Sequence, residues 1–78
     1  MARDARRDSQ FRAIRAAVAR HGLQGTTLTA SEIYDLVRDE DVGLSSAHEV
    51  ATVLGQHADE PDLTVEEGSP YRYEFSNL

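Results

Sequence analysis

Apolar residues recur at intervals of three and four positions in three segments of the chain, which predicts three amphipathic helices. The first helix covers residues 8–20. The second begins at Ala30 and ends in a charged run at residues 38–41, and the third covers residues 46–58. The residues expected to face the core are Phe11, Ile14, Ala17, Val18, Ile33, Leu36, Val37, Ala47, Val50, Ala51, Leu54 and Ala58.

Polar residues mark where these helices begin and end. Thr29 and Glu32 have the spacing of a capping box, in which two side chains satisfy backbone donors at a helix start. Ser46 and Glu49 have the same spacing and predict the start of the third helix. Gly22 is a good left-handed stop for the first helix.

After residue 58 the pattern changes to an alternation of apolar and polar residues, which is typical of strands. Gly and Pro in the loop at residues 67–70 predict a hairpin. Because an isolated hairpin is only marginally stable, its apolar face is expected to pack on the helices. Residues 23–28 are interpreted as a linker or a very short strand. The hairpin residues expected in the core are Leu63, Val65, Tyr71, Tyr73 and Phe75.

The charge of the chain is uneven, and Arg supplies all of its basic residues. Residues 1–20 contain six Arg and two Asp, whereas residues 21–78 contain two Arg and twelve carboxylates, for a net charge of −6. An acidic chain without Lys and with few aromatic residues resembles proteins of salt-loving archaea. In strong brine, where the Debye length is about 3 Å at 1 M salt, self-repulsion is screened, so the acidity is interpreted as an adaptation to the solvent.

The length predicts one domain over residues 1–78, with residues 1–7 frayed and residues 76–78 as a tail. No apolar run approaches the roughly 18 residues of a membrane span, so a soluble, cytoplasmic protein is expected. The chain has no cysteine, and Thr52 stands where a zinc-protease helix needs a second His. No metal, cofactor or catalytic residue is predicted, and His57 is expected to pack beside the hairpin.

Three helices followed by a hairpin, in this order and at this length, resemble the winged helix-turn-helix superfamily. The segments that carry the resemblance are residues 28–33, 46–54 and 71–75. The resemblance implies an α+β fold in which the third helix enters the major groove of DNA and a two-stranded antiparallel wing, with its tip at residues 67–69, lies along the backbone or minor groove. Carried onto this sequence, the positions that face the DNA are Ser45, His48, Glu49, Thr52 and Gln56.

The third helix departs from the usual pattern because it carries no Lys or Arg, and the expected wing tip carries Glu66 and Glu67. Phosphate neutralisation supplies most non-specific DNA affinity. The phosphate contacts are therefore assigned to Arg72 on the hairpin and to Arg12 and Arg15 on the first helix. The N-terminal Arg set fits a solvated helix face as well as a phosphate-binding arm.

Together these features predict a small DNA-binding protein, either a transcription regulator or a chromosome-associated factor, whose partner is double-stranded DNA. The alternative is a winged-helix protein-interaction module that makes no direct contact with DNA. No enzymatic activity is predicted. A homodimer through the first helix is a further hypothesis, because small residues there would allow close approach: Ala13, Ala16, Ala17 and Ala19.

Overall fold

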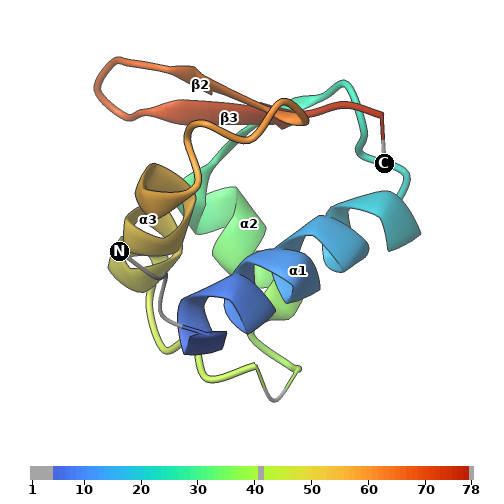
Figure 1. The fold of residues 1–78 in the computed structure, drawn as a ribbon, viewed down its shortest axis with the longest axis vertical. Coiled ribbons are helices and arrows are strands. Elements are labelled where there is room, and N and C mark those ends of the chain that lie inside the picture. Colours follow the sequence, from blue (N-terminus) through green and yellow to red (C-terminus); the bar gives the residue numbers. More distant parts are fainter. Residues whose placement is uncertain (1–4, 41, 78) are drawn as a thin grey trace.

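The computed structural model describes residues 5–40 and 42–77 and shows three helices and a three-stranded antiparallel sheet (Figure 1). The elements in chain order are α1 (Ala5–Arg20), β1 (Thr27–Thr29), α2 (Ala30–Val37), α3 (Ala47–Gln56), β2 (Leu63–Glu66) and β3 (Arg72–Phe75). The predicted α+β class is therefore confirmed, and the arrangement is compatible with a winged-helix-like fold. Predictions for residues 1–4, 41 and 78 lie outside the described residues.

Helix α1 is longer than the sequence pattern indicated. Residues 5–7, expected to fray, are helical, and the Arg7 guanidinium donates to the Gln10 side chain at 3.0 Å. Gln10 is buried, and its amide donates to the carbonyl of Gly43 at 3.1 Å. Gly43 has a φ of +77° in the turn between α2 and α3, so this bond ties the start of α1 to that turn.

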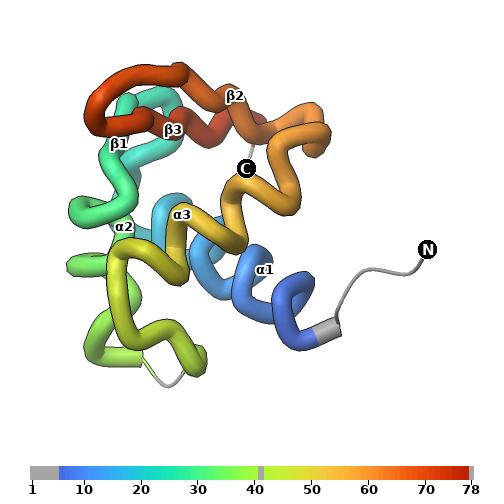
Figure 2. Tube along the Cα trace, turned by 90° about the vertical axis from the view of Figure 1, so that its left-hand side faces the viewer, coloured from blue at the N-terminus to red at the C-terminus, as the bar shows by residue number. Residues whose placement is uncertain are grey.

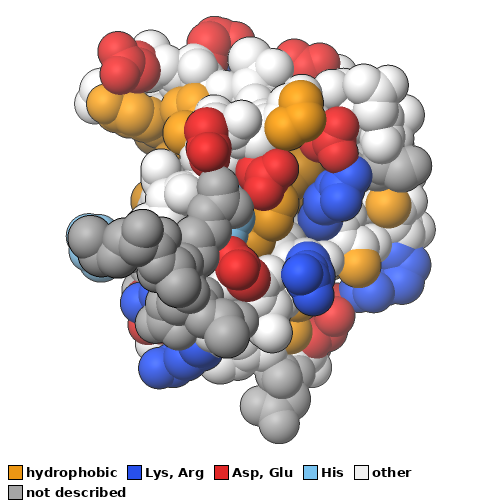
Figure 3. All heavy atoms as spheres, viewed as in Figure 1, with side chains coloured by type: hydrophobic (Ala, Val, Ile, Leu, Met, Phe, Trp, Pro, Cys, Tyr) orange, Lys and Arg blue, Asp and Glu red, His pale blue; other side chains and the backbone are white. Residues whose placement is uncertain are grey.

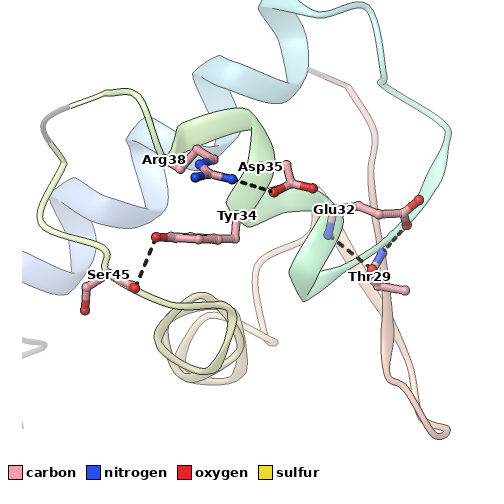
Figure 4. Close-up of polar contacts among 6 residues, drawn as sticks. All are labelled: Thr29, Glu32, Tyr34, Asp35, Arg38 and Ser45. Atoms are coloured by element: carbon pink, nitrogen blue, oxygen red, sulfur yellow. Dashed lines mark hydrogen bonds and ion pairs between the residues drawn. The ribbon is translucent and has the colours of Figure 1, made fainter.

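The two predicted capping boxes differ in the structure. Thr29 and Glu32 form both reciprocal bonds at the start of α2 (Figure 4). At the start of α3, the Ser46 hydroxyl accepts from the Glu49 amide at 3.2 Å, but the Glu49 carboxylate turns to Ser45 instead of Ser46. The capping box predicted there is thus only half formed, because Ser45 offers a backbone amide and a hydroxyl to the same carboxylate oxygen.

The sheet contains one strand more than the predicted two-stranded wing. Strand β3 lies in the centre, and β1 and β2 each pair with it in antiparallel fashion. Leu28 lies opposite Tyr73, and Val65 lies opposite the same residue from the other side. Residues 27–29 therefore form the short strand that the sequence left open, because β3 offers them backbone partners that only tertiary folding brings close.

The core lies between the three helices and one face of the sheet, and its members include Ile14, Val18, Ile33, Val50 and Phe75. Most of the residues predicted to face the core are buried in the structure.

Assignments to the core were wrong on α3 and on the hairpin. The buried positions of α3 are Val50, Val53 and Leu54, whereas Ala47 and Ala51 are only half-buried and Ala58, just after the helix, is exposed. The buried side of the helix is therefore rotated towards Val53. Tyr71 is 47% exposed, because it precedes β3 in the part of the hairpin that projects beyond the core (Figure 1).

His57 packs on α1 and not beside the hairpin as predicted. Its ring stacks on Phe11 with the ring centres 4.3 Å apart and the planes 3° apart. One ring nitrogen, Nε2, lies 2.7 Å from an oxygen of Asp8, and the other, Nδ1, lies 2.8 Å from the carbonyl of Val53. The turn after α3 directs the side chain towards α1, so this histidine is part of the core.

Candidate functional site

A groove of about 1080 Å³ lies between α3 and the β2–β3 hairpin, and it is called here the α3–hairpin groove. Its helix side is made of residues with small side chains, and its hairpin side is made of bulkier apolar ones together with two carboxylates. The small residues are Ala47, Ala51, Gly55 and Ala58; the hairpin residues are Val65, Glu66, Glu67, Pro70, Tyr71 and Tyr73. His48 and the start of α2 complete the lining.

The groove is acidic in its charged groups. Among the described residues that line it, Glu66 and Glu67 are charged and none is Arg, and the chain has no Lys at all. On the face of the molecule visible in Figure 3, carboxylates lie over the hairpin at the top, whereas Arg side chains, with carboxylates among them, lie lower down over α1. The groove therefore offers apolar contact area and negative charge.

Three of the five predicted DNA-facing residues are engaged in bonds within the domain. The carboxylate of Glu49 accepts from the Ser45 amide at 2.7 Å and from its hydroxyl at 2.5 Å, and these bonds lower the pKa of Glu49. The Thr52 hydroxyl donates to the His48 carbonyl of its own helix at 3.0 Å. His48 and Gln56 have exposed side chains on α3. The structure thus leaves His48 and Gln56 as the exposed polar groups among the predicted positions of α3.

Arg12 and Arg15 do not lie with the polar face of α3. His57 faces α1, and His48 is nine positions away, which places it on roughly the opposite side of the helix. Figure 2 looks onto α3 and shows α1 running away behind it. Arg12 lines a hollow with His57, and Arg15 pairs with Asp62, so the basic side of α1 is on another surface.

Arg72 projects from the outer face of the sheet, away from the core face that carries Tyr73. In the ladder it lies opposite Glu66 on one side and Thr29 on the other. It lines a shallow hollow together with Glu32 and Glu66. Two carboxylates therefore lie near this cation, and it does not join the exposed groups of α3.

The groove was not predicted from the sequence, because the alanines on its helix side were assigned to the core and Tyr71 was counted with the buried aromatic residues. One signal was present in the sequence. Gly55 lies inside a helix, where Gly is less stable than Ala by about 0.5–1 kcal/mol. Within residues 5–40 and 42–77, no atom lies within 4 Å of the position that a Cβ would take at Gly55, so no packing in this part of the chain requires a Gly there.

No helix in the described part of the chain is long and apolar enough to cross a membrane. Within residues 5–40 and 42–77, no three His, Cys, Asp or Glu side chains gather in a way that could hold a metal ion. Comparisons with known protein families, with curated proteins and with solved structures found no match to this chain.

Proposed function

We propose that this chain is a winged-helix domain that binds a partner protein through the α3–hairpin groove. Support for the fold comes from the element order, from the turn at Gly43 that joins α2 to α3, and from the sheet order β1-β3-β2. The observation that carries the function is the groove itself, which exposes Tyr71 beside apolar residues and contains carboxylates without Arg.

The composition of the groove matches what protein interfaces require. The buried centres of such interfaces are poor in charged residues and rich in Tyr, Trp and Phe. Tyr71 is the large apolar side chain left exposed among the described residues, and Val65 and Pro70 lie with it in the groove. An apolar area bordered by charged side chains is the usual sign of a binding surface.

The same surface is poorly suited to a phosphate backbone. Binding to duplex DNA depends on cations that replace the counterions of the phosphates. Glu66 and Glu67 would lie next to those phosphates, while Arg12 and Arg15 lie on a different side of the molecule. Protein binding therefore fits this geometry better than DNA binding does.

A pair of neighbouring variants separates the two functions. The full chain is purified from its own cells in high salt, its stoichiometric partner is identified, and the complex is rebuilt from the two purified proteins. Tyr71→Ala should weaken this complex about tenfold or more, as expected for an aromatic residue at an interface centre. Arg72→Ala, at the next residue and on the outer face of the sheet, should leave it unchanged. Equal affinity of both variants would contradict the proposal.

DNA binding is the second candidate function, carried by the exposed His48 and Gln56 on α3. Gln is suited to adenine in the major groove. In this case the domain would be a cytoplasmic transcription regulator or a chromosome-associated factor, and duplex DNA from its own promoter would be retarded in high salt. Gln56→Ala and Arg72→Ala would then both weaken retardation, whereas Tyr71→Ala would not.

A homodimer through α1 stays a prediction, but fewer of the small residues that suggested it are available on the surface of α1. Ala17 is fully buried within one protomer and cannot contribute to a dimer surface. Ala16 and Ala19 are exposed and line a shallow hollow with Arg12 and Arg15. Sedimentation equilibrium of the full chain, with Ala16→Gln as the variant that should dissociate a dimer, tests this prediction.

A further inference from the structure

We infer that the occupant of the α3–hairpin groove is an amphipathic helix of the partner protein, with apolar side chains facing Tyr71 and with Lys or Arg beside Glu66 and Glu67. This inference rests on the proposed function and adds the chemistry of the partner. Three features of the groove support it: its size and lining, the space beside α3, and its charge.

The groove is more open than a typical site for a small ligand. Sites for small molecules occupy roughly 300–1,000 Å³ and bury most of the ligand. This groove, of about 1080 Å³, is at the upper end of that range, and it lies open between α3 and the hairpin. Side chains line it on both sides, including Val65, Tyr71 and Tyr73 from one face of the hairpin. Although β2 is an edge strand of the sheet, the groove is lined by side chains on both walls, which suits a helix with apolar side chains.

Small residues on α3 leave room for the backbone of an approaching helix. Ala47, Ala51 and Gly55 recur along the groove side of α3, and Ala58 follows in the turn after the helix. The space beside Gly55 is empty of domain atoms, although Gly weakens the helix. A partner helix that packs closely at Gly55 would use this space, and its apolar side chains would reach Val65 and Tyr71 on the other wall.

The negative charge at the groove favours a partner helix that carries positive charge. Glu66 and Glu67 border the groove at the end of the hairpin, where Glu66 also lies opposite Arg72 of β3, and the chain as a whole carries a net charge of −6. An acidic helix would meet like charge from the hairpin and from the whole molecule. Lys or Arg at the edge of the partner helix would instead be attracted to these carboxylates, which also speeds the encounter.

Synthetic helical peptides test this chemistry on the full chain, in the lowest KCl concentration at which circular dichroism shows the domain folded. The probe peptide carries Leu on one face with Arg beside it. One control peptide replaces each Arg by Glu, and another replaces each Leu by Ser. The probe should bind and shift the NMR signals of Ala51, Gly55 and Tyr71. Both controls should bind at least about tenfold more weakly.

Two double variants with the same change in net charge test the role of the carboxylates. Glu66→Gln/Glu67→Gln should weaken binding of the Arg peptide, whereas Asp35→Asn/Asp39→Asn, on α2 and in the turn after it, should have little effect. Equal binding of the Arg and Glu peptides, or signal shifts confined to another surface, would overturn the inference. So would a Gly55-dependent self-association of the chain, because the occupant would then be a second copy.

The outcomes also distinguish this inference from the proposed function. If the native complex requires Tyr71 but is unaffected by Glu66→Gln/Glu67→Gln, the groove binds a partner whose chemistry differs from a basic helix. If the native complex is unaffected by Tyr71→Ala, the proposed function itself is wrong.

Discussion

At the scale of single residues, side-chain hydrogen bonds join both near neighbours in the sequence and residues of distant segments. The capping box of Thr29 and Glu32 follows from their spacing alone. The partner of His57 does not, because Asp8 is 49 positions away and only the packing of α1 on α3 brings them together. Glu49 lies between these cases, since a neighbouring Ser competes for its carboxylate.

The Glu49 carboxyl should titrate below the usual range of a glutamate. The side-chain bond to the Ser45 hydroxyl is the largest cause of its lowered pKa, and the backbone bond to Ser45 is the next. Because the folded-state pKa is depressed, this contribution to stability is present above the ordinary pKa of Glu and is lost as pH falls through the folded value. Side-chain NMR shifts of Glu49 measure the titration, and a midpoint at or above the usual value would contradict the bond.

Asp8→Ala should destabilise the domain by about 1 kcal/mol, because Nε2 of the buried His57 would lose its partner. The cost is kept at the low end because Asp8 is about one third exposed and water can reach the site. Chemical denaturation measures the effect. Ser9→Ala, at an exposed neighbouring position of α1, is the matched control and should be nearly neutral.

At the scale of elements, the three helices and the hairpin were predictable from periodicity, but their exact faces were not. The core-facing side of α3 was predicted partly from alanines, which occur on the buried and the exposed side of a helix alike. Val53, which is buried, was therefore not predicted in the core, and Ala58, which is exposed, was wrongly assigned to it. Strand β1 has three residues and owes its formation to β3. Tyr71 follows the alternation of the hairpin, yet it lies beyond the helices that would bury it.

Gly55→Ala should raise the free energy of unfolding by about 0.5–1 kcal/mol, because Ala is the better helix former and its Cβ meets no atom of the domain. Thermal or chemical unfolding measures this change. The same variant should weaken partner binding, since the added methyl group enters the space assigned to the partner helix. A loss of stability would show that the domain itself requires Gly at this position.

At the scale of the whole molecule, the uneven charge matters more than individual ion pairs. The pairs Arg15–Asp62 and Arg20–Glu40 are partly exposed, and such surface pairs contribute little. The net charge of −6 was known from the sequence. The position of Arg12 and Arg15 relative to α3 depends on how α1 packs and could not be predicted from the sequence. Because these residues lie on a different side of the molecule from the groove, protein binding is proposed in preference to DNA binding.

The domain should be less stable in dilute buffer than in molar KCl, because salt screens the repulsion among its carboxylates. In a domain of this size, each kcal/mol shifts the midpoint of thermal unfolding by about 4–8 °C. Midpoints measured across KCl concentrations test the prediction, with sucrose as an uncharged control for general stabilisation. Equal midpoints in dilute buffer and molar KCl would contradict the interpretation of the acidity as an adaptation to salt.

The central claim is that the α3–hairpin groove holds a partner protein, and blocking it with a neutral side chain tests this most directly. Gly55→Gln fills the space beside α3, and Ala19→Gln places the same side chain on the exposed side of α1. The measurement is the affinity of each variant for the purified native partner. We predict a loss of about tenfold or more, equal to about 1.4 kcal/mol, for Gly55→Gln and none for Ala19→Gln. Unchanged affinity of a folded Gly55→Gln variant would contradict the account.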